Sequence, residues 1–384
     1  MSNYVIDTEH RVTPLELFFD LVFVFAFTQV TTLWAEDVTW GGLGRGLLAL
    51  ILLWWAWASY AWLTNTVDAD AGKVVAVVSV AIAAMFVAAL AVPDAFGTHR
   101  LVFGAAFFIV MVTFVGLFAL AGRGERDLFD AVLRLIPTVI PGASLILAAA
   151  FVPHGVRPVL WLLAIVLGFL GPLFQGLSGW RVHAAHFAER HGLILIIAIG
   201  ESLAAIGIGA RGTALGTGVI VAVVLGLVVA ASFWLGYFDY FSTTVEQLIS
   251  ERDGVQRIRL ARDLYSYLHL PMVVGITLFA FGMKTTVAHV SADLHIIPAV
   301  ALCGGPALYL LAFVALRWRV SRSIGVGRST ASLCLAALTP LALVVPALAI
   351  LGLVTAIWLG LHAYELIWWR EERARRRARA PLPV

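Results

Sequence analysis

The feature that most constrains the fold is a series of twelve mostly apolar stretches, each about twenty residues long, in a chain of 384 residues. A helix of roughly 20 apolar residues crosses the hydrocarbon core of a bilayer, which is about 30 Å thick, so each stretch predicts a membrane-spanning helix. We therefore expect an all-α polytopic integral membrane protein with about 12 transmembrane helices. The predicted spans are residues 15–34, 43–64, 74–93, 101–121, 133–152, 158–174, 187–208, 214–237, 264–283, 296–316, 330–347 and 349–369.

The composition excludes the soluble classes of protein. Apolar residues make up 61% of the chain and charged residues 13%, whereas soluble domains carry about 25% charged residues. A globule in water cannot hide so much apolar surface. This excludes a soluble enzyme, a disordered tail, a secreted disulfide scaffold and a soluble nucleic-acid-binding protein. Glu16 and Asp20 interrupt the first apolar stretch, which therefore does not resemble a cleaved signal peptide and is expected to remain as the first span.

The distribution of lysines and arginines predicts the orientation. With a cytoplasmic N-terminus, 21 of the 26 basic residues fall on the cytoplasmic side, as the positive-inside rule requires. The other side receives Arg45, Arg100, Arg157, Arg211 and Lys284. We expect both termini in the cytoplasm. The arginines within 370–379 follow the last span directly, so we expect them to contact anionic lipids rather than nucleic acid.

Similar features at matching places suggest an internal repeat. Trp57 and Tyr60 end the second span as Trp234 and Tyr237 end the eighth. Six spans per half would make the two repeats parallel, with an axis normal to the membrane. The predicted parts are an N-terminal segment 1–14, a first half 15–174, a cytoplasmic linker 175–186, a second half 187–369 and a basic tail 370–384.

Prolines in corresponding spans of the two halves are candidate hinges. The fifth span carries Pro137 and Pro141, and the eleventh carries Pro340 and Pro346. Interrupted helices in matching halves often mark the substrate site of a transporter. The alternative is an ordinary kink, which membrane helices tolerate.

Glu201 is the acidic residue placed deepest in a predicted span. It lies ten residues beyond His191, which is about 15 Å along a helix, and glycines and alanines surround it. A charge at the bilayer centre costs about 2.5–3.5 kcal/mol and therefore needs a reason. Two interpretations stay open: an ion or proton site, or a protonated carboxyl that hydrogen-bonds a neighbouring helix.

Glu16 and Asp20 are four residues apart and share one face of the first span. They could form a mouth for cations, or pair with Arg190 or another arginine, which we favour slightly. Thr28 and Gln29 lie further along the same span and could complete a polar track or bridge helices. The candidate residues of a transport path are Glu201, Glu16, Asp20, His191, Ser202, Thr28 and Gln29.

The sequence contains no motif of a nucleophile, phosphate loop, dinucleotide site or zinc protease. We therefore expect no enzyme activity, no cofactor and no metal site.

Two segments resemble the bacterial low temperature requirement A family. The first runs from Leu15 through Glu16 and Asp20 to Val24, and the second from Glu189 to Ser202. The resemblance covers nearly the whole chain and implies a multi-span protein of the bacterial cytoplasmic (inner) membrane without an assigned substrate. Pro14 departs from the family pattern, which puts the start of the first helix in doubt.

The start of the first span also resembles, more weakly, the first helix of endolysosomal-type potassium channels, with Phe19 in place of a serine. This similarity implies that the first and seventh spans line a path. Our hypothesis is a transporter or channel for a small solute or cation, with a monovalent cation or a proton as the candidate ions. The alternative is a non-transporting sensor or scaffold that supports the cell envelope in the cold.

Overall fold

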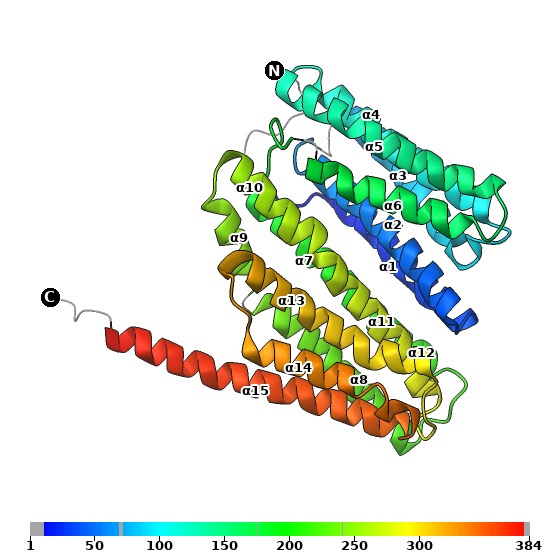
Figure 1. The fold of residues 1–384 in the computed structure, drawn as a ribbon, viewed down its shortest axis with the longest axis vertical. Helices are drawn as coiled ribbons and strands as arrows, with labels where there is room; N and C mark the ends of the chain where they lie inside the picture. The colour runs from blue at the N-terminus through cyan, green and yellow to red at the C-terminus, as the bar shows by residue number, and fades with distance from the viewer. Residues whose placement is uncertain (1–10, 69–71, 175, 240, 380–384) are drawn as a thin grey trace. The chain divides into compact units, whose positions relative to one another are not determined.

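The computed structural model describes residues 11–68, 72–174, 176–239 and 241–379, without the side chains of 241–243 and 368–379. Within these ranges the chain contains helices and no β-strand (Figure 1). Most of the predicted N-terminal segment 1–14, the end of the basic tail and the side chains of the 370–379 arginines lie outside the described residues.

Twelve helices in the described part of the chain are long and apolar enough to cross a membrane, which confirms the predicted number; each overlaps its predicted span, and the ninth begins earlier, at Gly254. Ten of them consist of or contain one long α-helix: α1 (Pro14–Glu36), α2 (Trp40–Thr64), α3 (Gly72–Ala91), α4 (Arg100–Gly122), α5 (Arg126–Ala148), α6 (Arg157–Phe174), α7 (Ala184–Gly209), α8 (Thr217–Phe238), α14 (Val326–Ala337) and α15 (Ala347–Arg379). Short 3₁₀ turns extend α3, α5 and α14: η1 (Val92–Asp94), η2 (Ala149–Phe151) and η5 (Leu341–Leu343). A further helix, α9 (Phe241–Ser250), follows α8.

The other two spans each contain a π-helical turn. One joins α10 (Gly254–Ala261), η3 (Arg262–Tyr267) and α11 (His269–Ala288), and the other joins α12 (Ile296–Ala299), η4 (Val300–Gly304) and α13 (Gly305–Ser321). Pro271 and Pro306 follow the two turns. A proline lacks the backbone N–H and its ring presses on the carbonyl four residues earlier, here that of Tyr267 or Leu302. Local π geometry is one way in which membrane helices accommodate this.

Contacts group the chain into two compact units. Unit 1 comprises Met1–Glu201 and Gly236–Thr277, and unit 2 comprises Ser202–Leu235 and Leu278–Val384. In unit 1, α3, α4, α5 and α6 pack in sequence, and α1 packs against α2 and α3 (Figure 1). In unit 2, α13 packs on α14 and α14 on α15. These groupings carry no information on internal symmetry, so the two six-helix repeats stay a prediction.

The helix start that Pro14 put in doubt is well formed. Proline is favoured at the first helical position because the N–H it lacks would be unpaired there. Thr13 and Glu16 form a capping box, in which the Glu16 carboxylate accepts from the backbone N–H of Thr13 at 2.8 Å. One residue of the predicted charged pair therefore also fixes the beginning of α1.

A short turn joins α1 to α2. Thr39 caps α2 by accepting from the N–H of Gly42, and its hydroxyl donates to Asp37 at 2.7 Å. Together with the ion pair to Arg45, this hydrogen bond holds the pKa of Asp37 below its usual value. The turn sets α1 and α2 side by side, so the beginning of α1 and the end of α2 lie at the same side of unit 1.

The four candidate hinge prolines lie in two kinds of place. Pro137 and Pro141 lie inside α5, which continues through both. Pro340 and Pro346 lie between α14 and α15, on either side of η5.

Candidate functional site

Three buried charged side chains join the first turns of α1 to α7 in unit 1. Arg190 donates from Nη1 to Glu16 Oε1 and from Nη2 to Asp20 Oδ1, both at 2.7 Å. The side chains of the three residues are at most 2% exposed. The geometry thus realises the pairing alternative for Glu16 and Asp20. We call Glu16, Asp20 and Arg190 the ion cluster.

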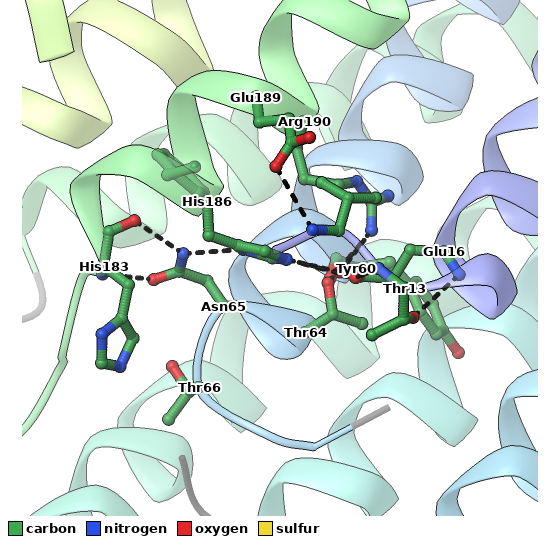
Figure 2. A network of polar contacts seen from close by, with 12 residues as sticks. Thr13, Glu16, Tyr60, Thr64, Asn65, Thr66, His183, His186, Glu189 and Arg190 are labelled. Carbon is green, nitrogen blue, oxygen red and sulfur yellow. Dashed lines mark hydrogen bonds and ion pairs between the residues drawn. The ribbon is translucent and has the colours of Figure 1, made fainter. Parts of the chain in front are cut away.

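Neutral side chains add hydrogen bonds to the ion cluster (Figure 2). Thr64 at the end of α2 accepts from Arg190 at 3.1 Å. Asn65 Nδ2 lies 3.0 Å from His186 Nδ1, and His186 Nε2 lies 3.2 Å from Glu16 Oε2. Because the amide donates to Nδ1, the ring proton lies on Nε2 and is donated to Glu16. The cluster thus binds the beginnings of α1 and α7 to the end of α2.

The indole of Trp57 supplies a further donor, from Nε1 to Asp20 Oδ1 at 2.8 Å. Asp20 is 1% exposed and its Oδ2 has no hydrogen-bond partner among the described residues. Loss of a donor to a buried acceptor costs about 1–3 kcal/mol. We therefore expect Trp57→Phe, which keeps a ring in place, to destabilise the protein by an amount in this range, measured as a lower melting temperature in detergent. An unchanged melting temperature would show that the indole N–H contributes nothing to holding Asp20.

Glu201 lies apart from the ion cluster, against two threonines of α1. Thr31 Oγ1 lies 2.8 Å from Glu201 Oε1, and Thr28 Oγ1 forms a short hydrogen bond with Oε2. The side chain of Glu201 is fully buried. Because α7 begins at Ala184, Glu201 lies about 25 Å along the helix from its start and about 12 Å from its end at Gly209.

The two threonine hydroxyls beside Glu201 have fewer protons than acceptor atoms within hydrogen-bond distance. Thr28 Oγ1 also lies 3.1 Å from Val24 O, and Thr31 Oγ1 lies 3.0 Å from Thr28 O. Each threonine hydroxyl can donate one proton. When the Glu201 carboxyl is ionised, these two protons must be shared among four acceptor contacts. A protonated Glu201 brings a third proton and can donate to Thr28, whose own proton then goes to Val24.

An apolar layer separates the ion cluster from Glu201. Arg190 and Glu201 are eleven residues apart on one face of α7, about 16 Å along the helix. Ile194 and Ala198 between them are fully buried, and Phe23 and Phe27 of α1 are at most 1% exposed. These buried apolar side chains separate the ion cluster from the polar group around Glu201.

The remaining path candidates are not part of these two groups. Gln29 is half-buried, and Ser202 is buried with no hydrogen-bond partner for Oγ among the described residues. His191 donates from Nδ1 to Phe187 O at 2.8 Å and packs among Trp57, Tyr265 and His269.

His191 belongs to a buried aromatic cluster with Tyr265 of η3 and His269 of α11. His269 Nε2 lies 2.9 Å from the hydroxyl of Tyr237, and its Nδ1 lies 2.8 Å from Leu264 O. In contrast, His191 Nε2 and the Tyr265 hydroxyl have no hydrogen-bond partner within the described ranges. Among the residues that the structure describes, no group of three or more His, Cys, Asp or Glu side chains could hold a metal ion.

Sequence reasoning missed His186, Asn65 and Tyr265. His186 precedes Arg190 by four residues, so the helical spacing that linked Glu16 to Asp20 could also have linked these two. Nothing in the sequence distinguishes Asn65 or Tyr265 from other polar residues near the ends of spans.

Comparison with known proteins gives a family but no activity. The family described as "Bacterial low temperature requirement A protein (LtrA)" matches residues 11–363. An uncharacterized protein of Rhizobium meliloti is 28% identical over 371 residues, covering 89% of this chain and 87% of that protein. No solved structure matches the chain significantly.

Proposed function

Because the chain belongs to the bacterial low temperature requirement A family, we propose that it is a membrane transporter or channel for a small cation, with the proton as the species the geometry favours. The path follows α1 and α7, and Glu201 is the group that binds and releases the proton. We place the protein in the bacterial cytoplasmic membrane with both termini inside, on the strength of the asymmetry of its lysines and arginines.

This proposal rests on the environment of the Glu201 side chain. A carboxyl group deep in a membrane-spanning helix is costly, and hydroxyls of two threonines on another helix surround this one. The number of hydroxyl protons suits a protonated carboxyl better than an ionised one. Loss of its proton would leave the threonines to rearrange their hydrogen bonds, which links protonation to the contact between α1 and α7.

The apolar layer between Arg190 and Glu201 fits an occluded state. In a transporter that alternates between two states, a site at depth is closed to one side by packed side chains until a helix moves. Phe23, Phe27 and Ile194 are fully or almost fully buried and would have to separate for a proton to pass between Glu201 and the predicted cytoplasmic side.

The same burial is the observation that favours the second candidate, a non-transporting sensor or scaffold. In that case Glu201 is a protonated carboxyl that bonds α7 to α1 as a structural contact, and no opening is needed. The two functions differ in whether the carboxyl ever exchanges its proton with water on both sides.

The test is proton flux into liposomes containing the purified protein and a trapped pH-sensitive dye, with a potassium diffusion potential as driving force. Glu201→Gln keeps an oxygen for Thr31 and offers an N–H to Thr28, so it mimics the protonated state without an exchangeable proton. We expect this variant to lower the flux at least about tenfold, as loss of an essential proton carrier does.

A matched control is Glu365→Gln, which removes a carboxylate from an ion pair with Arg328 in unit 2 and should leave the flux unchanged. Wild-type flux equal to that of protein-free liposomes, under gradients of protons, sodium and potassium, would reject transport and favour the scaffold. Unchanged flux in Glu201→Gln would remove Glu201 from the path.

A further inference from the structure

A cavity in unit 1 of about 110 Å³, partly open to the exterior, lies away from Glu201 and plays no part in the proposed path. Its walls come from α2, α4, α5, α6, the segment that follows α6, α10 and the π-helical turn η3. Cavities that enclose a whole small molecule measure about 300–1,000 Å³ and have apolar walls with a few polar groups. This cavity is smaller, so it can take part of a longer molecule that extends through its opening, and the walls determine which kind of molecule.

Aromatic side chains form most of the wall on α2 and hold η3 in place. Trp54 and Trp62 are two helical turns apart, about 12 Å along α2. Their indole N–H groups donate to the same residue of η3, Trp54 to Ser266 O and Trp62 to Ser266 Oγ, both at 2.8 Å. Further aromatic side chains add to the apolar surface: Trp55, Trp180, Phe114 and Phe169. This long wall favours an extended apolar group.

Most polar groups of the described lining are already engaged within the protein. The Tyr267 hydroxyl donates to Phe169 O at 2.7 Å, and Ser59 donates to Trp55 O at 2.8 Å. The two indole donors are occupied by Ser266. Apart from the indole N–H groups of Trp55 and Trp180, this stretch of the described lining offers a ligand no donor, which favours an apolar chain there.

Arg262 is the one charged residue among the described lining residues. Its Nε and Nη2 donate to Asp263 Oδ1 at 3.0 and 2.7 Å, and its Nη1 donates to Pro172 O at 2.8 Å. A guanidinium has five N–H donors, so two remain. The Ser266 hydroxyl accepts from Trp62 and keeps its own proton to donate. Two donors left for a ligand, the guanidinium of Arg262 and the hydroxyl of Ser266, therefore lie together on η3, near the end of α2 at Trp62.

We propose that this cavity binds an amphiphile with an apolar chain and one anionic headgroup, the chain along the tryptophans and the headgroup on Arg262 and Ser266. Arginine in a fixed orientation binds carboxylates and phosphates well. Basic pockets between membrane helices on the cytoplasmic side are known settings for anionic lipid headgroups, and Arg262 belongs to the side predicted to be cytoplasmic. A quaternary ammonium, which aromatic residues also bind, is disfavoured because the charged lining residue is itself a cation.

The test is photo-cross-linking of the full chain in nanodiscs of zwitterionic lipid, with two probes that carry a diazirine on the acyl chain. One probe is palmitic acid and the other is phosphatidylglycerol, so the two arms distinguish a free fatty acid from a phospholipid. Digestion and mass spectrometry locate the cross-links. We expect them at Phe114 or in 54–62, 131–139, 168–180 or 258–267, and we expect an excess of the same unlabelled molecule to remove them.

A filling variant and a matched control separate binding in the cavity from contact with bulk lipid. Gly176 lines the cavity, and a Cβ there meets no atom closer than Ser178 Oγ at 4.0 Å. Gly176→Leu should lower the cross-linking at least about fivefold, and Ala58→Leu, from another wall, should do the same. Gly116 on α4 has open space around it and does not line the cavity, so Gly116→Leu should cross-link like the wild type.

A separate variant tests the proposed contact between Arg262 and the headgroup. Arg262→Gln should weaken competition by unlabelled palmitate or phosphatidylglycerol about tenfold while the segments cross-linked stay the same. Cross-links only at residues outside these lining segments, or equal yields in the wild type and both filling variants, would overturn the proposal. Unchanged competition in Arg262→Gln would overturn the assignment of an anionic headgroup. None of these measurements depends on flux through Glu201, so the proposal of a bound amphiphile is tested independently of the proposal of transport.

Discussion

Replacing Arg190 with methionine is expected to destabilise the protein by about 3–5 kcal/mol, because it leaves two carboxylates buried without their cation. Glu16 and Asp20 are at most 2% exposed and both bond to the guanidinium of Arg190. Methionine preserves much of the apolar volume, so the effect is one of charge rather than of a cavity. The measurement is the melting temperature in detergent, followed by tryptophan fluorescence and by size-exclusion chromatography.

Two comparisons make this prediction specific. Arg328→Met breaks an ion pair that is only partly buried, with side chains 20% and 23% exposed, so we expect it to cost less than Arg190→Met. The triple variant Glu16→Gln, Asp20→Asn, Arg190→Met removes the charges together and should regain much of the loss, as neutral replacements of buried ion pairs often do. An equal loss in Arg190→Met and Arg328→Met would show that the ion cluster is not a buried electrostatic contact.

The membrane spans were predictable from sequence because apolar length alone determines them. The ninth span begins earlier than predicted, at Gly254 rather than residue 264, because the arginines of 254–262 hide the helical start from a hydropathy argument. The π turns were not predicted. Pro271 and Pro306 follow the two turns, but whether a proline produces a kink, a break or a π turn depends on the packing around it.

The candidate site was predictable only in part. Helical spacing put Glu16 and Asp20 on one face and left Arg190 as one of two interpretations for them. The contacts of Glu201 with Thr28 and Thr31 could not be derived, because sequence spacing within a helix does not say which face of another helix it meets. For the same reason, the hydrogen bonds of Trp54 and Trp62 to Ser266 join residues about two hundred positions apart that no local pattern connects.

The second large effect is expected in unit 2, where Gly282 of α11 packs directly on the π turn η4. A Cβ at this position would lie 2.6 Å from the backbone nitrogen and 2.7 Å from the Cα of Leu302. Backbone atoms cannot rotate away as the end of a side chain can, so the helices would have to separate. Overpacking costs typically about 1–3 kcal/mol, and more where the backbone resists. We expect Gly282→Val to reach or exceed about 3 kcal/mol.

Cys303, in the same π turn, provides a local probe for this change. Its side chain is fully buried, whereas Cys334 is exposed, so in a Cys334→Ser background a thiol-reactive dye reports on η4 alone. Gly282→Val should make Cys303 react at temperatures where the parent does not, because the helices that cover it are forced apart. A Cβ at Gly352 of α15 would meet no atom within 4 Å, so Gly352→Val should leave the reaction of Cys303 unchanged. Slow labelling of Cys303 in Gly282→Val, equal to that of Gly352→Val, would mean that α11 and η4 do not approach each other as closely as their backbones indicate.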